Sequence, residues 1–322
     1  MKVRLGYVAG PEGRQELRYA HTMTYRMYQT LSVEERNQKL DQMIRKNLEN
    51  LLKVLKWNTA HGIYFYRFSQ NMIPLATKEE VEFDYITPYQ TLYQEIGNYV
   101  KKNGIRLDTH PDQFCILNST KKIVTENSIR YLEFNKKIFD AMNLPACTIL
   151  HVGSGEGGKS ASIERFINTW KILPESLQKM IVLENDDRTF HTKDVLELCQ
   201  RIKVPFVFDY HHHLCNPCEE SLEILLPQIR NTWKQSNLIP KMHFSSPKSA
   251  TSFRAHNRWI EPFRFYDFLK VIAPFYDSVD IMLECKGKEL ALQKLSHVLR
   301  FFPSIHRFTD GIFDFTNKDC EK

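Results

Sequence analysis

The sequence lacks any apolar run long enough to cross a membrane, and its first residues, MKVRLGYVAG, contain no extended apolar segment typical of a secretory signal peptide. It also lacks low-complexity stretches, linkers rich in Pro, Gly or Ser, and abrupt changes of composition. These absences argue against membrane association and against a chain of several domains. We expect one catalytic domain over residues 1–300, a C-terminal extension of unknown role over residues 301–322, and a monomer.

Paired cysteine motifs are also scarce. The seven cysteines are an odd number scattered along the chain, which favours reduced thiols in a cytoplasmic protein over a disulfide framework. Cys215 and Cys218 form one C-x-x-C motif, but no second motif completes a zinc cage. We therefore disfavour a structural zinc site or a thioredoxin-like redox role.

The excess of positive charge is small, with 44 Lys and Arg against 38 Asp and Glu, a formal net charge of +6. Bound metal that neutralised several acids would leave the exposed remainder clearly basic, and a basic surface suits a phosphate backbone. Composition alone fits a merely solubilising charge equally well. With 42% hydrophobic and 25% charged residues, the chain has the composition of a globular protein.

Short apolar runs alternate with longer segments of helical spacing. In the clearest helical segment, Leu40, Ile44, Leu48, Leu51 and Leu55 share one face, and Ser32 with Glu35 predicts a capping box at its start. Eight β-rich runs separated by helices predict a single (β/α)8 TIM barrel with a parallel sheet. The runs are VRLGYVA, IYFYRFS, IRLDTH, CTILHVG, MIVLEND, PFVFDYH, PKMHFSS and VDIMLECKG.

The ends of these runs carry side chains that can bind metals or transfer protons. In a TIM barrel the carboxyl ends of the strands hold the active site. A single His or Glu at a strand end is most often structural, but six successive runs end in His or an acid. Clustered carboxylates would repel one another unless cations bind between them, so we expect a site for two or three divalent metals. In order, the run ends are Tyr7, Arg67 with Ser69, His110, His151, Glu184, Asp209 with His212, Lys241 with His243, and Glu284.

At these residues the sequence resembles the UV damage endonuclease family (UvsE/UVDE). The similarity is carried in order from about residue 2 to about residue 289 by RLGYV, RFSQNMIPLAT, THPDQF, ILHVGSGEGGK, VLENDDRTF, FVFDYHHHLCNP, PKMHFSSP and IMLECKGKE. The resemblance implies a TIM barrel similar to endonuclease IV and xylose isomerase. It also implies an enzyme that nicks double-stranded DNA immediately 5′ of ultraviolet lesions and depends on manganese. The products would carry a 3′-hydroxyl and a 5′-phosphate, and the enzyme would be cytoplasmic and nucleoid-associated. Magnesium, cobalt and zinc are the alternative metals.

The resemblance also implies the ligand sets. Glu184 would bridge two metals, His110 and His151 would complete one, and Asp209, His243 and Glu284 the other. A third metal would be held by His212 and His256. Lys241 matches a lysine that can be carboxylated in this family, and Tyr7 matches an active-site tyrosine. Neighbouring side chains diverge, so His211 and His213 are expected either to support the ligands or to lie in solvent.

Four further residues are implied in DNA binding. Gln113 and Phe114, just past His110, match a pair that enters the duplex where damaged bases are flipped out, although QF in a loop is more often ordinary packing. Lys159 matches a lysine that would contact phosphate, with a solvated loop lysine as the alternative. Lys78 stands where many members have His, which puts the lesion range in question.

Two rival functions stay open from sequence. A metal-dependent sugar isomerase or epimerase would keep the barrel but need a closed pocket instead of a basic groove. A non-catalytic damage-binding protein would use metal only for structure, which fits poorly with so many carboxylates at an open mouth.

Overall fold

The computed structural model describes residues 1–111, 114–236 and 238–316 of the chain. Eight parallel strands follow one another around a barrel in the order β3-β2-β1-β8-β7-β6-β5-β4. A single parallel bridge between Thr109 and Thr148 joins β3 to β4 and nearly closes the circle. All eight predicted runs are strands: β1 (Lys2–Val8), β2 (Phe65–Arg67), β3 (Arg106–Asp108), β4 (Thr148–His151), β5 (Ile181–Glu184), β6 (Phe206–Asp209), β7 (Lys241–Phe244) and β8 (Ser278–Leu283). The predicted barrel is confirmed.

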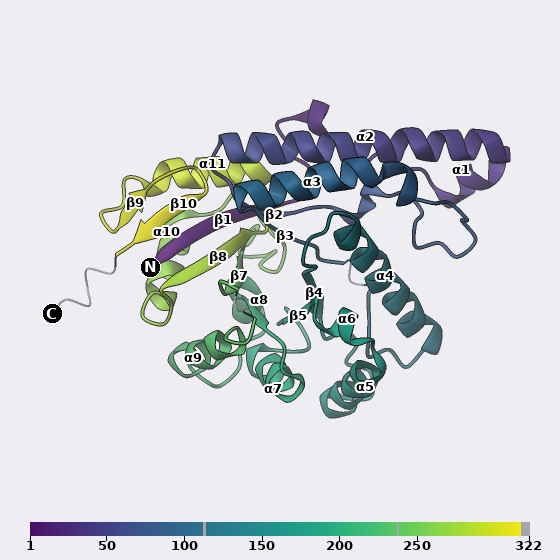
Figure 1. Ribbon diagram of the computed structural model, residues 1–322. Coiled ribbons are helices and arrows are strands. Elements are labelled where there is room, and N and C mark those ends of the chain that lie inside the picture. Colours follow the sequence, from purple (N-terminus) through teal and green to yellow (C-terminus); the bar gives the residue numbers. More distant parts are fainter. Residues whose placement is uncertain (112–113, 237, 317–322) are drawn as a thin grey trace.

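Helices surround the barrel, and helices α2 and α3 lie side by side along one edge (Figure 1). The α-helices are α1 (Tyr25–Thr30), α2 (Val33–Ala60), α3 (Gln90–Asn103), α4 (Lys122–Ala141), α5 (Lys159–Ile172), α6 (Glu175–Gln178), α7 (Thr192–Ile202), α8 (Tyr210–Cys215), α9 (Leu222–Thr232), α10 (Pro262–Ile272) and α11 (Lys288–Leu299). Short 3-10 turns span η1 (Gln15–Leu17), η2 (Gln70–Met72) and η3 (Thr87–Tyr89). In the part of the chain described, no helix combines the length and apolarity that a membrane span needs.

Helix α2 begins as the sequence predicts. The Ser32 hydroxyl accepts from the backbone N–H of Glu35, and the Glu35 carboxylate accepts from the backbone N–H of Ser32, so two backbone donors at the start of the helix are paired. All five leucine and isoleucine positions of the predicted apolar face are buried. Ile44, Leu48, Leu51 and Leu55 belong to the main hydrophobic core, whereas Leu40 packs in a separate cluster with Met23 and Tyr28.

The segment after residue 301 is part of the barrel sheet. Strands β9 (Ile305–Arg307) and β10 (Ile312–Phe315) form an antiparallel hairpin, and β10 pairs with β1 in the register Lys2 to Asp314. Phe313 and Phe315 are buried. The predicted extension therefore continues the catalytic domain as far as residue 316, because β1 has a free edge below its short pairing with β2.

The pleat of β1 decides which side chains reach the barrel interior. Val3, Leu5 and Tyr7 point to the helix layer, where the Tyr7 hydroxyl donates to Oδ1 of Asn58 on α2 at 2.7 Å. Arg4 points inward and forms a bidentate ion pair with Asp280 of β8, in which Nε and Nη2 each donate to a carboxylate oxygen at 2.6 Å. The barrel interior thus holds charged pairs as well as apolar side chains.

Candidate metal centre

Glu184 is the hub of a cluster at the carboxyl ends of the strands. It ends β5, is fully buried, and belongs to all three groups of donor atoms that are close enough together to share a cation. In the first group, Nε2 of His110 lies 3.0 Å and Nε2 of His151 lies 3.9 Å from Glu184 Oε2. The structure therefore joins three of the predicted ligands around one oxygen.

The second group adds Asp209 and His212. Asp209 ends β6 and caps α8, because its carboxylate accepts from the His212 backbone N–H at 2.7 Å. Asn185 fixes the strand end: its side chain exchanges two hydrogen bonds of 2.9 Å with the Asp209 backbone. His212 Nδ1 donates to the Asn185 carbonyl at 2.9 Å and lies 3.3 Å from Glu184 Oε1, so the ring is held between the ends of β5 and β6.

The third group is Glu184, His243 and Glu284. His243 Nδ1 lies 2.9 Å from Glu184 Oε1 and 3.2 Å from Glu284 Oε1. The first group agrees with its predicted set. The second predicted set is divided differently, because Asp209 is grouped with His212, and His243 Nδ1 is 3.9 Å from Asp209 Oδ2.

Several buried donor atoms in this cluster have no hydrogen-bond partner. They are Oε1 of Glu184, Oδ2 of Asp209, Nδ1 of His243 and Nδ1 of His151. Buried polar atoms in folded proteins are nearly always paired, so unpaired oxygens and nitrogens that converge in this way are suited to hold a cation. The donor set of imidazole and carboxylate suits divalent ions such as manganese or zinc. The residues present therefore fit the metals that the sequence predicts.

The net charge of the cluster also favours the binding of cations. The site and its surroundings contain four carboxylates and two cationic side chains, so two negative charges remain when the histidines are neutral. The carboxylates are Asp108, Glu184, Asp209 and Glu284, and the cations are Arg67 and Lys241. Burial alone would lower the pKa of His212, but the Asp209 and Glu184 carboxylates outweigh it and raise this pKa to about 11. Burial would raise the pKa of Glu184, but His243 and His151 hold it well below its usual value. The cluster thus attracts positive charge strongly.

Beneath the cluster lies a buried charge network that the sequence did not single out. Asp108 of β3 pairs with Lys241 Nζ at 2.5 Å and accepts from Arg67 Nε at 2.9 Å, and all three residues are buried. Burial would raise the pKa of Asp108, but the charges of Lys241 and Arg67 outweigh it and lower this pKa.

Lys241 lies fully buried inside the barrel, and its predicted carboxylation stays a prediction. Its ammonium is held by Asp108 and lies 3.5 Å from the Cys147 sulfur, whereas a carboxylated lysine would bring another anion against Asp108. The sequence offered one signal for Asp108 and Arg67. Each is a charged residue inside or at the end of an apolar run that predicts a buried strand.

Three histidines at this mouth have other surroundings. His256 lies beside the cluster, with its ring centre 6.2 Å from that of His212, and among the described residues it joins no group of three donors. His211 and His213 are buried, not solvated. His213 Nδ1 pairs with the Thr192 hydroxyl at 2.9 Å, and the His211 ring packs against His256. Both therefore support the loops that carry the ligands.

Two predicted residues lie away from the donors. The hydroxyl of Tyr7 is bound to Asn58 in the helix layer, so the structure does not bring this predicted catalytic tyrosine to the cluster. Lys159, at the start of α5, is exposed and pairs with Asp194 at 2.6 Å. Its predicted phosphate contact is untested by this geometry.

Phe114 and Lys78 line one hollow of about 450 Å³ beside the mouth. Phe114 is 76% exposed, which is unusual for a large apolar side chain. The Lys78 ammonium lies 5.3 Å from the centre of the Tyr25 ring. Gln113, the predicted partner of Phe114, lies outside the described residues.

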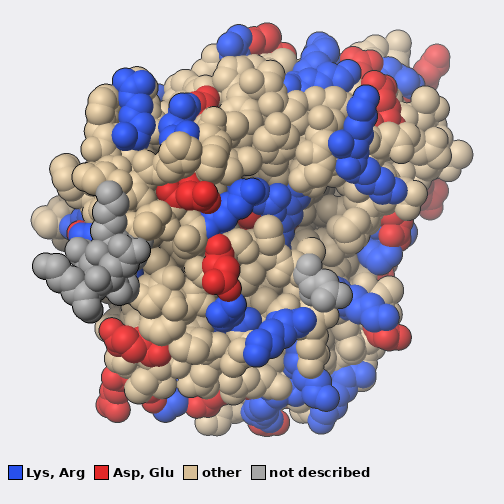
Figure 2. Space-filling model, turned by 60° about the vertical axis from the view of Figure 1, so that its left-hand side comes forward, with Lys and Arg blue, Asp and Glu red and all other residues tan. Residues whose placement is uncertain are grey.

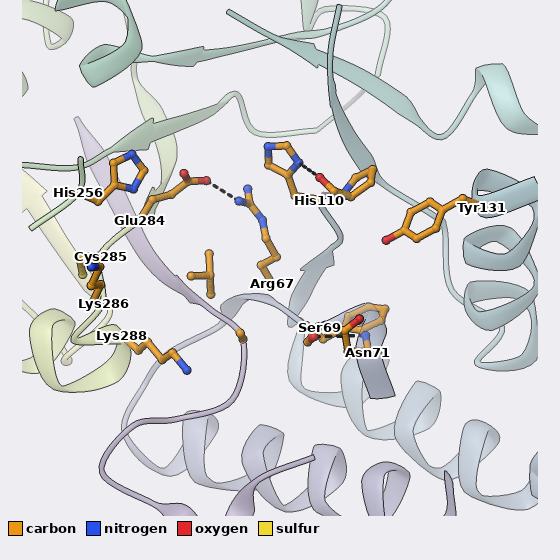
Figure 3. Close-up of a pocket in the computed structure, with 14 residues that line it drawn as sticks. Arg67, Ser69, Asn71, His110, Tyr131, His256, Glu284, Cys285, Lys286 and Lys288 are labelled. Carbon is orange, nitrogen blue, oxygen red and sulfur yellow. Dashed lines mark hydrogen bonds and ion pairs between the residues drawn. The ribbon is translucent and has the colours of Figure 1, made fainter. Parts of the chain in front are cut away.

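Two further hollows border the ligands. One, of about 630 Å³, is lined by Arg67, His110, His256, Glu284, Lys286 and Lys288 among others, and Figure 3 shows the Arg67 guanidinium reaching toward Glu284. The other, of about 420 Å³, lies on the side of His151, Asp186 and His212. On the face shown in Figure 2, Lys and Arg side chains gather around a central depression, with some acidic side chains beside them.

Fold and site define a class: a TIM barrel with a buried histidine–carboxylate centre where its strands end. Residues 3–316 match the family described as UV-endonuclease UvdE, and the chain belongs to this family. The UV DNA damage endonucleases of Bacillus cereus (strain Q1) and Bacillus anthracis (strain A0248) are each 41% identical over 313 residues, which cover 97% of this chain and 99% of the relative.

Solved structures agree with this family. The crystal structure of SacUVDE is 34% identical, has a TM-score of 0.83, and covers 92% of this chain and 98% of its own. Endonuclease IV from Thermus thermophilus shares the fold at 12% identity, with a TM-score of 0.55 and coverage of 92% and 99%. Membership of the family assigns the chain to the DNA repair endonucleases, which confirms the predicted enzyme class. The sugar isomerase and the non-catalytic binding protein are therefore set aside.

Proposed function

We propose that the protein nicks double-stranded DNA immediately 5′ of ultraviolet photolesions by metal-dependent hydrolysis. The substrates are cyclobutane pyrimidine dimers, and the range extends to 6-4 photoproducts and abasic sites. The products carry a 3′-hydroxyl and a 5′-phosphate. The observation that carries this proposal is the convergence of unpaired buried donors on Glu184, since such a centre fits phosphodiester chemistry.

Two or three divalent ions, with manganese favoured, would be held by His110, His151, Glu184, Asp209, His212, His243 and Glu284, and His256 stands beside them. When bound, such ions polarise phosphate oxygens and activate water near neutral pH. The chain itself orients the ligands through the Asn185, Pro111 and Asp209 contacts. Arg67 and Lys286 add positive charge to the neighbouring cavity.

Lesion selection is assigned to the rim of the mouth. A damaged step is partly unstacked, so extruding it costs less than extruding an intact pair. Phe114 projects into solvent beside the metal ligands and would fill the gap in the stack, with Lys78 in the same hollow near the backbone. The exposed aromatic ring would serve no evident purpose in a small-molecule pocket.

The test uses an end-labelled duplex with one defined pyrimidine dimer. The expected result is one manganese-dependent cut at the phosphodiester 5′ of the dimer, with ends that a ligase and a polymerase both accept. Chelator should abolish the cut, and an undamaged duplex of the same sequence should stay intact. Equal cutting of both duplexes would contradict lesion specificity, and cutting in chelator would contradict metal dependence.

Phe114→Ala should weaken binding of the lesion duplex and leave metal content unchanged. A base-stacking aromatic contributes about 1–3 kcal/mol, which corresponds to roughly a five- to more than hundredfold loss of affinity. The measurement is fluorescence anisotropy with damaged and intact duplexes. Phe263→Ala is the matched control, because Phe263 is 74% exposed but lies at the start of α10. Equal losses in both variants, or none in either, would rule out the wedge.

A further inference from the structure

A hollow of about 370 Å³ lies at the amino ends of the strands, at the opposite end of the barrel from the metal centre. Its walls come from the start of β3, the segments just before β4 and β7, and the ends of α3 and α4. Most of the lining side chains are apolar, including Val100, Ile105, Leu107, Phe139 and Leu144. The seam between β3 and β4, which a single bridge closes, therefore borders an apolar space.

Two arginines and one carboxylate meet at this hollow. Arg4 and Arg106 both line it, and both donate to the fully buried carboxylate of Asp280. Among the described residues, neither arginine forms an ion pair with another carboxylate. One positive charge is therefore left over, and Arg106 has little access to water because only 10% of its side chain is exposed. A bound anion would offset the cost of this buried charge.

Arg106 also has hydrogen-bond donors that no protein atom uses. Its Nη1 donates to the Ile239 carbonyl at 2.5 Å and to Asp280 Oδ2 at 2.7 Å. Its Nη2 is buried without a partner, and its Nε makes no hydrogen bond within the described part of the chain. Nε and Nη2 form the edge of a guanidinium through which Arg4 holds both oxygens of Asp280. On Arg106 this two-donor edge is vacant.

Two aromatic rings restrict the orientation of this edge. The Arg106 guanidinium carbon lies 5.7 Å from the centre of the Phe65 ring and 5.4 Å from that of Trp233. Such contacts, together with the bonds from Nη1, hold the plane of the guanidinium. The vacant edge is thus already oriented before a ligand binds.

The chemistry of the hollow selects one class of ligand. A single excess charge matches a monoanion, and two donors on one edge match the two coplanar oxygens of a carboxylate. The apolar walls match a hydrocarbon body, and small-molecule sites typically have volumes of about 300–1,000 Å³. A DNA backbone fits poorly, because it is polar along its whole length and the metal centre lies at the other end of the barrel.

We propose that this hollow binds a small carboxylic acid with an apolar body, whose carboxylate pairs with the vacant edge of Arg106. The bound acid would neutralise the excess charge and contact the walls on both sides of the β3–β4 seam. A ligand that binds only the folded chain stabilises it, so the acid would raise the melting temperature. The site is separate from the metal centre, and the proposal does not rest on the proposed function.

The test titrates the full-length protein with phenylacetate by isothermal titration calorimetry, in a buffer without carboxylates. One molecule should bind per chain, and the melting temperature should rise with the phenylacetate concentration. Phenylacetamide, the neutral analogue of nearly the same shape, should bind at least about tenfold more weakly, because it cannot form a charge-assisted pair. Equal affinities for the acid and the amide would contradict the pairing with Arg106.

Two variants locate the site. Arg106→Gln removes the vacant edge but leaves Asp280 paired with Arg4, and it should lower the affinity for phenylacetate at least about tenfold. Ala146→Phe fills the hollow without changing any charge, and it should abolish binding. The control is Arg230→Gln, which removes an arginine from a surface pair with Asp277 away from the hollow, and it should bind like the wild-type protein.

Circular dichroism confirms that each variant is folded before it is titrated, and Ala146→Phe keeps the test decisive if Arg106→Gln does not fold. No binding of phenylacetate to the wild-type protein would overturn the proposal. Wild-type affinity in either folded variant would also overturn it, because the acid would then bind elsewhere, for example at the metals. Nicking of damaged DNA is measured separately, and its outcome does not bear on this site.

Discussion

Glu184→Gln is expected to lower nicking of a dimer-containing duplex by at least about a hundredfold while the protein remains folded. The change keeps the volume of the side chain and removes the charge that all three donor groups share. Bound manganese should fall in the same variant, because an amide is a weaker ligand than a carboxylate. The measurements are single-turnover nicking and metal content by mass spectrometry.

The control for this variant is Glu156→Gln, an exposed glutamate that accepts a hydrogen bond from the Thr120 hydroxyl outside the cluster. It should keep both activity and metal content. Nicking at the wild-type rate by Glu184→Gln would contradict the assignment of Glu184 as the carboxylate that the metal sites share.

Asp108→Asn should destabilise the protein strongly. Asp108 and Lys241 are fully buried and Arg67 nearly so, and the carboxylate is the shared counter-charge of both cations. Removing one partner of a buried pair leaves an uncompensated charge and costs about 3–5 kcal/mol. Urea unfolding of the metal-free protein, followed by circular dichroism, measures the loss.

Two further variants test this explanation. Adding Lys241→Met to Asp108→Asn removes one orphaned cation, so the double variant should regain part of the lost stability. Asp277→Asn breaks the Asp277–Arg230 pair, which has a similar 2.6 Å separation but lies at the surface with Asp277 90% exposed. It should change stability little. A similar loss for the buried and the exposed pair would contradict the importance of burial.

The sequence predicted the barrel well because each strand is a short run of β-favouring residues. It did not predict which face of β1 points inward. Lys2 and Arg4 alternate with Val3 and Leu5, but a charged side chain normally indicates the solvent side, whereas Arg4 lies inside the barrel and pairs with Asp280. Tyr7 was therefore assigned to the mouth, although the pleat turns it toward Asn58. The hairpin of β9 and β10 was also missed, although Asp310-Gly311 between two runs with aromatic residues is a turn signal.

The residues of the cluster were predicted, and so was the group of Glu184, His110 and His151, but the pairing of Asp209 with His212 was not. Asp209 and His212 come together because α8 starts directly after β6, with Asp209 as its cap, so helical geometry selects the middle histidine of three. Arg67 and Asp108 were visible as charges at strand ends, but only distances show that Arg67 binds two ligands and that Asp108 holds Lys241.

Anomalous diffraction from manganese-soaked crystals tests the central claim most directly. The account predicts anomalous density within bonding distance of Glu184, flanked by His110 and His151 on one side and by Asp209 and His212 on the other. Manganese density that is absent from Glu184 and its neighbours would contradict the metal centre and, with it, the proposed route to the nick.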